Sequence, residues 1–137
     1  LTAYHGLNNL LWVWNGQSRD YYVGQAYYDI ASIDVYLRAD AEYGSRYGQF
    51  QWLYALTEGE KLLALSECSR IPDVDAIFRD NAVWSFFGLW YGDYLVGQDG
   101  TLNGKYISTD DLIKYYNSDG TLSLSEYIKM SQKSLAN

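Results

Sequence analysis

Four short apolar segments, separated by longer stretches, constrain the fold of this sequence more than any other feature. They are LLWVW at 10–14, IASIDVY at 30–36, LLALSE at 62–67 and WSFFGLW at 84–90. Each has the length of a strand, and they begin at intervals of roughly 20 to 32 residues. Helices are expected in or after the later stretches, over 47–58, 73–82, 108–116 and 123–135. Strands that alternate with helices are typical of a parallel sheet with right-handed crossovers.

This pattern predicts an α/β fold with four parallel strands. A (β/α)8 TIM barrel needs eight such strands and usually about 250 residues, whereas this chain has 137 residues. Four strands and this chain length therefore favour half of a barrel. The runs 10–14 and 62–67 are nearly continuously apolar, which indicates strands buried on both faces. The segment 16–25 is expected to be an irregular loop with one short turn at most.

Composition and charge argue against several classes of function. The formal net charge of -7 leaves no basic surface for nucleic acid or for an anionic membrane. No stretch approaches the roughly 18 to 20 apolar residues of a membrane span. The single histidine, His5, cannot build a multi-histidine site, and the turns at Asp99 and Asp119 lack the spaced ligands of a calcium loop. We therefore expect no metal and no cofactor.

Acidic and aromatic residues lie at the ends of the predicted strands, which is where parallel α/β folds place their chemistry. Glu67 ends the third run, and Asp34 and Tyr36 share a face at the end of the second. Trp14 and Trp90 close the first and fourth runs. A carboxylate surrounded by Tyr and Trp suits a pyranose, because aromatic faces stack on the C–H face of a sugar while polar groups bind its hydroxyls. The chain has 15 Tyr and 5 Trp.

Each of these residues also has a structural interpretation. A strand-end glutamate is a common salt-bridge partner, and a carboxylate such as Asp34 often caps a helix or a loop. Trp14 and Trp90 also suit core packing. Strict alternation predicts that Leu63, Leu65 and Glu67 share one face of their strand. The only cysteine, Cys68, then faces away from Glu67 and is expected to be a small packed residue or to pair with a cysteine outside this chain.

Four segments together resemble glycoside hydrolase family 26, whose members are mainly endo-β-1,4-mannanases. The segments are HGLNNLLWVWNGQ at 5–17, YDIASIDVY at 28–36, ALSECSRIPDVD at 64–75 and FRDNAVWSFFGLWYGDY at 78–94. The resemblance implies a (β/α)8 barrel in which residues 1–137 form the C-terminal half, strands five to eight. It also implies that the N-terminal half of the barrel is missing from this chain.

The resemblance assigns roles to individual residues. Glu67 matches the catalytic nucleophile, and Tyr36 matches the tyrosine that hydrogen-bonds and orients it. Asp34 matches a neighbouring acidic position, and Trp90 matches the tryptophan that forms the floor of the subsite for the sugar to be cleaved.

Further positions match less directly or depart from the family pattern. Trp14 and Asn15 match positions at the border of the substrate cleft. Tyr91 stands where some members have arginine, which bears on subsite preference. Ser69 stands where the family often has glycine.

The implied function is that of a secreted, retaining endo-β-1,4-mannanase acting on mannan, glucomannan or galactomannan. The reaction runs through a covalent glycosyl-enzyme on Glu67, with an acid/base glutamate from the missing N-terminal half. The partners expected are thus a β-mannan-type polysaccharide and that N-terminal half. Three alternatives stay open: a relative acting on β-1,3-1,4-glucan or β-1,3-xylan, a non-catalytic carbohydrate-binding half-barrel, and two self-associating copies that close one barrel.

Overall fold

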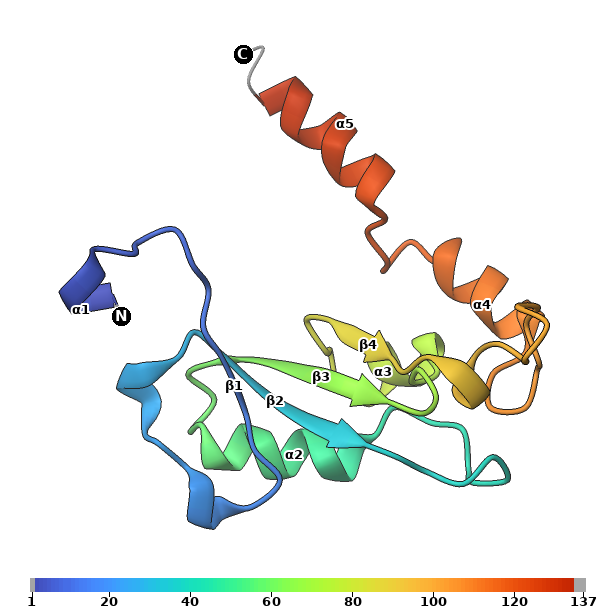
Figure 1. Ribbon diagram of the computed structural model, residues 1–137, viewed down its shortest axis with the longest axis horizontal. Coiled ribbons are helices and arrows are strands. Elements are labelled where there is room, and N and C mark those ends of the chain that lie inside the picture. Colours follow the sequence, from blue (N-terminus) through green and yellow to red (C-terminus); the bar gives the residue numbers. More distant parts are fainter. Residues whose placement is uncertain (1, 135–137) are drawn as a thin grey trace.

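A four-stranded parallel sheet with the order β1-β2-β3-β4 organises the computed structural model, which describes residues 2–134. The strands are β1 (Val13–Asn15), β2 (Ile30–Val35), β3 (Leu62–Cys68) and β4 (Phe87–Leu89). Every neighbouring pair is parallel, so the carboxyl ends of the strands lie along one edge of the sheet (Figure 1). The predicted parallel α/β arrangement of four strands is confirmed.

Among the described residues, four helices lie in the predicted order, after a short helix near the N-terminus that was not predicted. In chain order, the helices are α1 (Thr2–His5), α2 (Tyr47–Leu56), α3 (Val74–Arg79), α4 (Thr109–Tyr116) and α5 (Leu124–Ser134). The expected last residue of α5, position 135, lies outside the described residues. The expected irregular loop at 16–25 contains the 3-10 turn Arg19–Tyr21, and a second such turn, Gln25–Tyr27, begins at its last position. Within residues 2–134, every helix is too short or too polar to cross a membrane.

Local sequence explains where α3 and α4 begin. The Asp73 side chain accepts a hydrogen bond of 2.8 Å from the backbone N–H of Ala76, which satisfies one of the free donors of the first turn of α3. Ser108 and Asp111 form a reciprocal capping box at the start of α4. Such caps stabilise a helix by about 1 kcal/mol each, and they fix the residues at which α3 and α4 begin.

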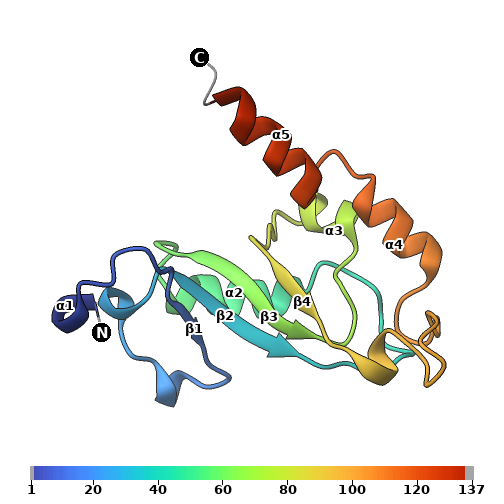
Figure 2. The same ribbon diagram turned by 45° about the horizontal axis from the view of Figure 1, so that its top comes forward.

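The hydrophobic core lies between one face of the sheet and the helices α2, α3 and α4. Leu65 of β3 and Leu53 of α2 are both fully buried at 0% exposure, and burying each such side chain stabilises the fold by about 1.5–3 kcal/mol. Tyr115 of α4 packs edge-on against Phe87 of β4, with 4.8 Å between the ring centroids. In Figure 2, α2 lies behind the sheet and no helix covers the near face. Only one face of the sheet is therefore covered by helices among the described residues.

The expectation that the run 10–14 is a strand buried on both faces is wrong. Strand β1 begins only at Val13, and Leu10, Leu11 and Val13 are 45%, 76% and 42% exposed. The reason is that β1 is an edge strand: it pairs with Ile30–Ser32 of β2 on one side, and no described strand lies on its other side. The second apolar run of this kind, in β3, does lie between two strands and is mostly buried.

Candidate active site

Strand β3 contains one more residue than its neighbours at the point where it reaches the carboxyl edge. On one side, Leu65 and Glu67 lie opposite Ile33 and Asp34, which are consecutive residues of β2. On the other side, Leu65 and Cys68 lie opposite Phe87 and Leu89. Because both registers slip after Leu65, and β3 has one residue more than its partner in each case, the extra residue belongs to β3. It is Ser66, the centre of a β-bulge.

The bulge corrects the expected alternation of side chains. Leu63, Leu65 and Cys68 all belong to the buried core, whereas Glu67 does not. Strict alternation would have placed Glu67 on the core face with Leu65. The inserted Ser66 moves Glu67 to the face of its register partner Asp34. That face is opposite to the core, because Ile33 and Val35 on either side of Asp34 pack into the core. The expectation that Cys68 faces away from Glu67 as a small packed residue is confirmed, since Cys68 is 1% exposed.

Tyr36 and Glu67 are joined by the shortest contact between two predicted site residues. The Tyr36 hydroxyl donates a hydrogen bond of 2.6 Å to Oε2 of Glu67. Tyr36 directly follows β2, and the parallel pairing of β2 with β3 brings the two side chains together at the carboxyl edge. Burial and the hydrogen bond to the Glu67 carboxylate both raise the pKa of Tyr36, so the phenol stays protonated and acts as a donor to a charged acceptor.

Asp34 lies beside Glu67 and is held from the other side by Asn15. The Asn15 amide donates to both carboxylate oxygens of Asp34, at 3.0 and 3.1 Å. Burial raises the pKa of Asp34, and the neighbouring charge of Glu67 raises it further. The hydrogen bond from Asn15 lowers this pKa but does not cancel the rise. Two carboxylates thus lie next to each other at this edge, one held by an amide and the other by a phenol.

Aromatic rings extend from Tyr36, on one side of this pair of carboxylates. Trp90 follows β4, and its backbone N–H donates to the carbonyl of Cys68 at 2.9 Å, which fixes it next to the end of β3. The Trp90 ring meets the Tyr36 ring edge-on, with 6.5 Å between centroids. Trp90 is 38% exposed and Tyr91 is 73% exposed. Trp90 therefore presents surface to solvent beside Tyr36, and Tyr91 does so beside Trp90, with 5.2 Å between those two ring centroids.

Two tyrosines that were not singled out from the sequence extend this group. Tyr94 lies 5.3 Å from the Tyr36 ring, and Tyr106 lies 4.7 Å from the Tyr94 ring. Both come from the long segment after β4, which has no repeating pattern from which their position could be read. The abundance of tyrosine in the composition was the only available signal.

Trp14 is the one predicted site residue that the structure places apart from the others. Its Nε1 donates to the Tyr21 carbonyl at 3.2 Å, and its ring packs against Tyr22 and Tyr28 at 5.3 and 5.8 Å. A methyl group built on Gly16 would come within 2.2 Å of the Trp14 ring. These contacts describe a side chain that holds the loop after β1 against the core.

Ser69 links the loops that follow β2 and β3. Its hydroxyl accepts from the Leu37 N–H at 2.8 Å and donates to the Leu37 carbonyl at 3.1 Å. The serine is fully buried, so these bonds form without competition from water. The hydroxyl at this position therefore ties the segment that carries Tyr36 to the segment that carries Glu67.

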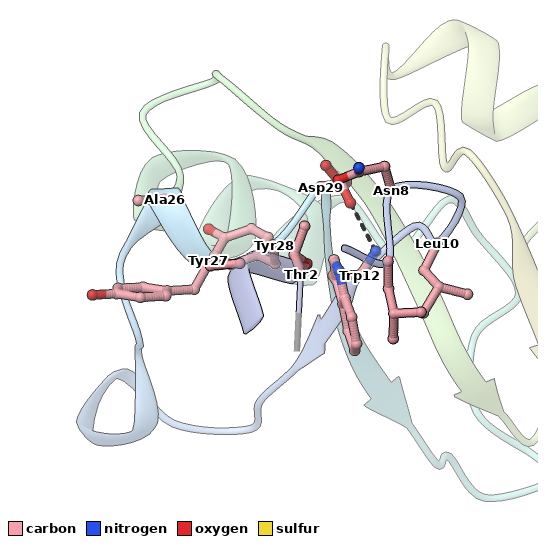
Figure 3. Close-up of a pocket in the computed structure, with 10 residues that line it drawn as sticks. Thr2, Asn8, Leu10, Trp12, Ala26, Tyr27, Tyr28 and Asp29 are labelled. Carbon is pink, nitrogen blue, oxygen red and sulfur yellow. Dashed lines mark hydrogen bonds between the residues drawn. The ribbon is translucent and has the colours of Figure 1, made fainter. Parts of the chain in front are cut away.

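A cavity of about 720 Å³ lies at the opposite end of β1 and β2 (Figure 3). Its lining includes Leu10, Trp12, Tyr27 and Asp29, and the backbone N–H of Trp12 donates to the Asp29 carboxylate at 2.7 Å. These residues precede the strands and are separated from Glu67 by the length of the sheet. The carboxylates and exposed rings at the carboxyl edge are thus the better candidate for an active site.

Known proteins resemble almost the whole chain. The sequence profile of Glycosyl hydrolase family 26 matches residues 1–123. A mannan endo-1,4-β-mannosidase of Thermothelomyces thermophilus is 35% identical over 126 residues, which is 92% of this chain and 24% of that protein. The chain therefore spans about a quarter of the length of this relative.

Solved structures give the same result. A β-(1,4)-mannanase of family 26 from Podospora anserina is 35% identical, with a TM-score of 0.76 over 92% of this chain and 26% of its own. A β-mannanase from a symbiotic protist of the termite Reticulitermes speratus, complexed with gluco-manno-oligosaccharide, is 27% identical. Its TM-score is 0.72 over 88% of this chain and 36% of its own. With the profile match covering the strands, Glu67 and its neighbours, the chain belongs to glycoside hydrolase family 26.

Proposed function

We propose that this chain supplies the nucleophile half of a retaining endo-β-1,4-mannanase. The observation that carries the proposal is the 2.6 Å hydrogen bond from Tyr36 to Glu67 at the carboxyl edge of a parallel sheet. A carboxylate that accepts a hydrogen bond from a phenol through one oxygen is fixed in direction, which leaves its other oxygen aimed for attack. The names of the family relatives, which act on β-mannans, support the substrate class.

In the proposed reaction, one oxygen of Glu67 attacks the anomeric carbon while Tyr36 holds the other. The C–O bond to the leaving sugar breaks as the glycosyl-enzyme ester forms, and water later hydrolyses that ester. A second carboxyl group, roughly 5 to 5.5 Å from the first, protonates the leaving oxygen and then activates the water. Asp34 binds sugar hydroxyls together with Asn15, while Trp90 and Tyr91 provide the apolar surface under the ring.

The acid/base glutamate in this proposal comes from the N-terminal half of a (β/α)8 barrel, of which this chain forms strands five to eight. Two observations support this arrangement. Strand β1 has an unpaired outer edge among the described residues, with Val13 and the preceding Leu11 exposed, and such an edge suits a further parallel strand. The face that carries Glu67 has no helix over it among residues 2–134, as expected for the inside of a barrel (Figure 2).

The gene upstream of the codon for Leu1 provides the first test. An in-frame continuation that encodes a strand ending in glutamate supports the proposal, whereas a stop codon directly upstream contradicts it. We call the protein that contains both halves the completed barrel. Its polymeric substrates do not cross membranes, so we place the enzyme outside the cell.

The completed barrel is then tested on glucomannan. We expect a 2-deoxy-2-fluoro-mannosyl donor to label Glu67 covalently, and mass spectrometry of the labelled peptide identifies the residue. We expect Glu67→Gln to abolish hydrolysis and labelling while oligosaccharide binding persists. Labelling of a different carboxylate, or full activity of Glu67→Gln, would contradict the assignment.

The same experiments separate the alternatives. Higher turnover of β-1,3-1,4-glucan or β-1,3-xylan than of glucomannan points to a different substrate within the family. A completed barrel that binds oligosaccharide but forms no glycosyl-enzyme even without substitution, and whose binding is unchanged in Glu67→Ala, points to a carbohydrate-binding protein. A stable dimer of this chain in sedimentation, formed without the N-terminal half, points to two copies that close one barrel.

A further inference from the structure

The geometry points to the β-bulge at Ser66 as the device that aims the nucleophile, with Gly88 and Ser32 as its positioning residues. This inference rests on the proposed function, because it concerns how Glu67 is held for attack. In a regular strand of the same sequence, with Ser66 in the ladder, Glu67 would continue the face of Leu63 and Leu65 and would point into the core. The bulge gives it the face of Asp34 and brings it to Tyr36.

Gly88 makes room for the bulge. A methyl group built on Gly88 would lie 2.5 Å from the backbone carbonyl oxygen of Ser66 and 3.5 Å from its carbon. Real Cβ atoms do not approach a backbone oxygen so closely, and a carbonyl cannot rotate away as a flexible side chain does. Strand β4 can therefore pass the bulge only because residue 88 has no side chain. Its neighbours Phe87 and Leu89 pack against the core from the opposite face of the strand.

Hydroxyl groups hold the bulge from the other side. The Ser66 hydroxyl donates to the hydroxyl of Ser32 at 2.5 Å, and Ser32 in turn donates to the carbonyl of Trp14 at 3.1 Å. Ser32 is fully buried at 0% exposure, so its hydroxyl depends on these two bonds. The chain of bonds crosses three strands, from β3 through β2 to β1, and fixes the direction of the extra residue.

The substitution Gly88→Ala tests this inference, with Gly48→Ala as its matched control. Gly48 lies in α2, and a methyl group built there meets nothing within 4 Å. We expect Gly88→Ala to displace Glu67 and to break its bond with Tyr36. NMR titration of tyrosine-labelled chain then shows the pKa of Tyr36 falling toward the ordinary value near 10. Gly48→Ala leaves that pKa unchanged. An unchanged Tyr36 titration in folded Gly88→Ala overturns the inference.

Kinetics of the completed barrel give a second readout that separates positioning from general destabilisation. We expect kcat of Gly88→Ala to fall on the order of 10- to 100-fold while KM changes less than about twofold, because sugar contacts remain but the attacking oxygen is misplaced. Full activity of Gly88→Ala beside an inactive Glu67→Gln overturns this inference and leaves the proposed function standing. An active Glu67→Gln removes the proposed function, and the Tyr36 titration still decides whether the bulge places Glu67.

Ser66→Ala carries the test if Gly88→Ala does not fold. This variant removes one hydroxyl and adds no atoms, and Ser32 keeps its bond to the Trp14 carbonyl. We expect a smaller shift of the Tyr36 pKa in the same direction and a loss in kcat of about 3- to 10-fold. A Tyr36 titration and a kcat equal to those of the unsubstituted protein would show that the hydroxyl chain does not position Glu67.

Discussion

The hydroxyl of Tyr36 donates to Glu67 across 31 positions of sequence, with 2.6 Å between the two oxygens. Three features produce this contact: the parallel register of β2 and β3, the bulge at Ser66 and the tie from Ser69 to Leu37. Each of these features positions the backbone next to Tyr36 or Glu67. The position of the carboxylate is therefore a property of the strand ends and not of a single loop.

Removing the Tyr36 hydroxyl should reduce catalysis more than binding. A hydrogen bond to a charged group contributes about 1.5–3 kcal/mol, which corresponds to roughly a 10- to 100-fold loss in rate. We expect Tyr36→Phe in the completed barrel to lower kcat by this factor and to leave KM nearly unchanged. Tyr94→Phe is the control, because Tyr94 touches Tyr36 with its ring. Equal losses in both variants would contradict a special role for the Tyr36 hydroxyl.

Trp90 should contribute mainly to substrate binding. It lies beside Tyr36 and is 38% exposed, and Phe86 is 40% exposed at the other end of β4. We expect Trp90→Ala to weaken the affinity of the completed barrel for manno-oligosaccharides about tenfold, which corresponds to roughly 1.4 kcal/mol of lost contact. Phe86→Ala should leave the affinity unchanged. Isothermal titration calorimetry measures both, and equal affinities in all three proteins would exclude Trp90 from the binding surface.

Trp14 should affect stability and not sugar binding. Its ring packs against Tyr22 and Tyr28 and covers Gly16. We expect Trp14→Ala to lower the free energy of unfolding by about 2–4 kcal/mol, somewhat below the cost for a fully buried tryptophan. Gly16→Ala should also destabilise, because its methyl group meets the indole. Chemical denaturation and calorimetry on the same samples check this, and a loss of oligosaccharide affinity without a loss of stability would return Trp14 to the substrate cleft.

The parts of the fold that depend on local pattern could be predicted from the sequence. The position of β2 between an irregular loop and α2 follows from the run 30–36, and α4 follows from Ser108 and the acidic residues after it. Strand β1 begins later than the predicted run 10–14, because the length of an edge strand depends on the strand with which it pairs. Only residues opposite Ile30–Ser32 can join the ladder.

The sequence predicted which residues belong to the site, but it did not predict how the strands bring them together. The strand-end positions and the family resemblance brought Glu67, Tyr36, Asp34, Asn15 and Trp90 together as candidates, and the structure places them at one edge. The bulge was missed because it depends on the register of three strands and on the missing side chain of Gly88. The residue pattern of the run 62–67 contains no information about the register of the other strands or about Gly88.

Alkaline pH should destabilise the fold through its buried tyrosines. Burial raises the pKa of Tyr43 to about 12 and raises the pKa of Tyr115 further. The folded state keeps these protons, while the unfolded chain loses them near pH 10. Their stabilising contribution is thus complete below about pH 9 and is lost as the pH rises past 10. Urea unfolding between pH 8 and 11 should show a shallower decline for Tyr115→Phe than for the exposed neighbour Tyr116→Phe. Equal slopes would contradict this.

Ser69 should stabilise the junction of the two loops that follow β2 and β3, next to Tyr36 and Glu67. Ser69→Gly removes a buried hydroxyl that bonds both the N–H and the carbonyl of Leu37, and unmade buried bonds cost about 1–3 kcal/mol. Ser85→Gly is the matched control, because Ser85 is exposed and its hydroxyl makes one bond, to the Leu63 carbonyl. Both variants gain the same backbone freedom in the unfolded chain, so that contribution cancels in the comparison. We expect a larger fall in Tm for Ser69→Gly, together with a lower kcat in the completed barrel. A Tm equal to that of Ser85→Gly would show that the glycine common in the family fits this junction equally well.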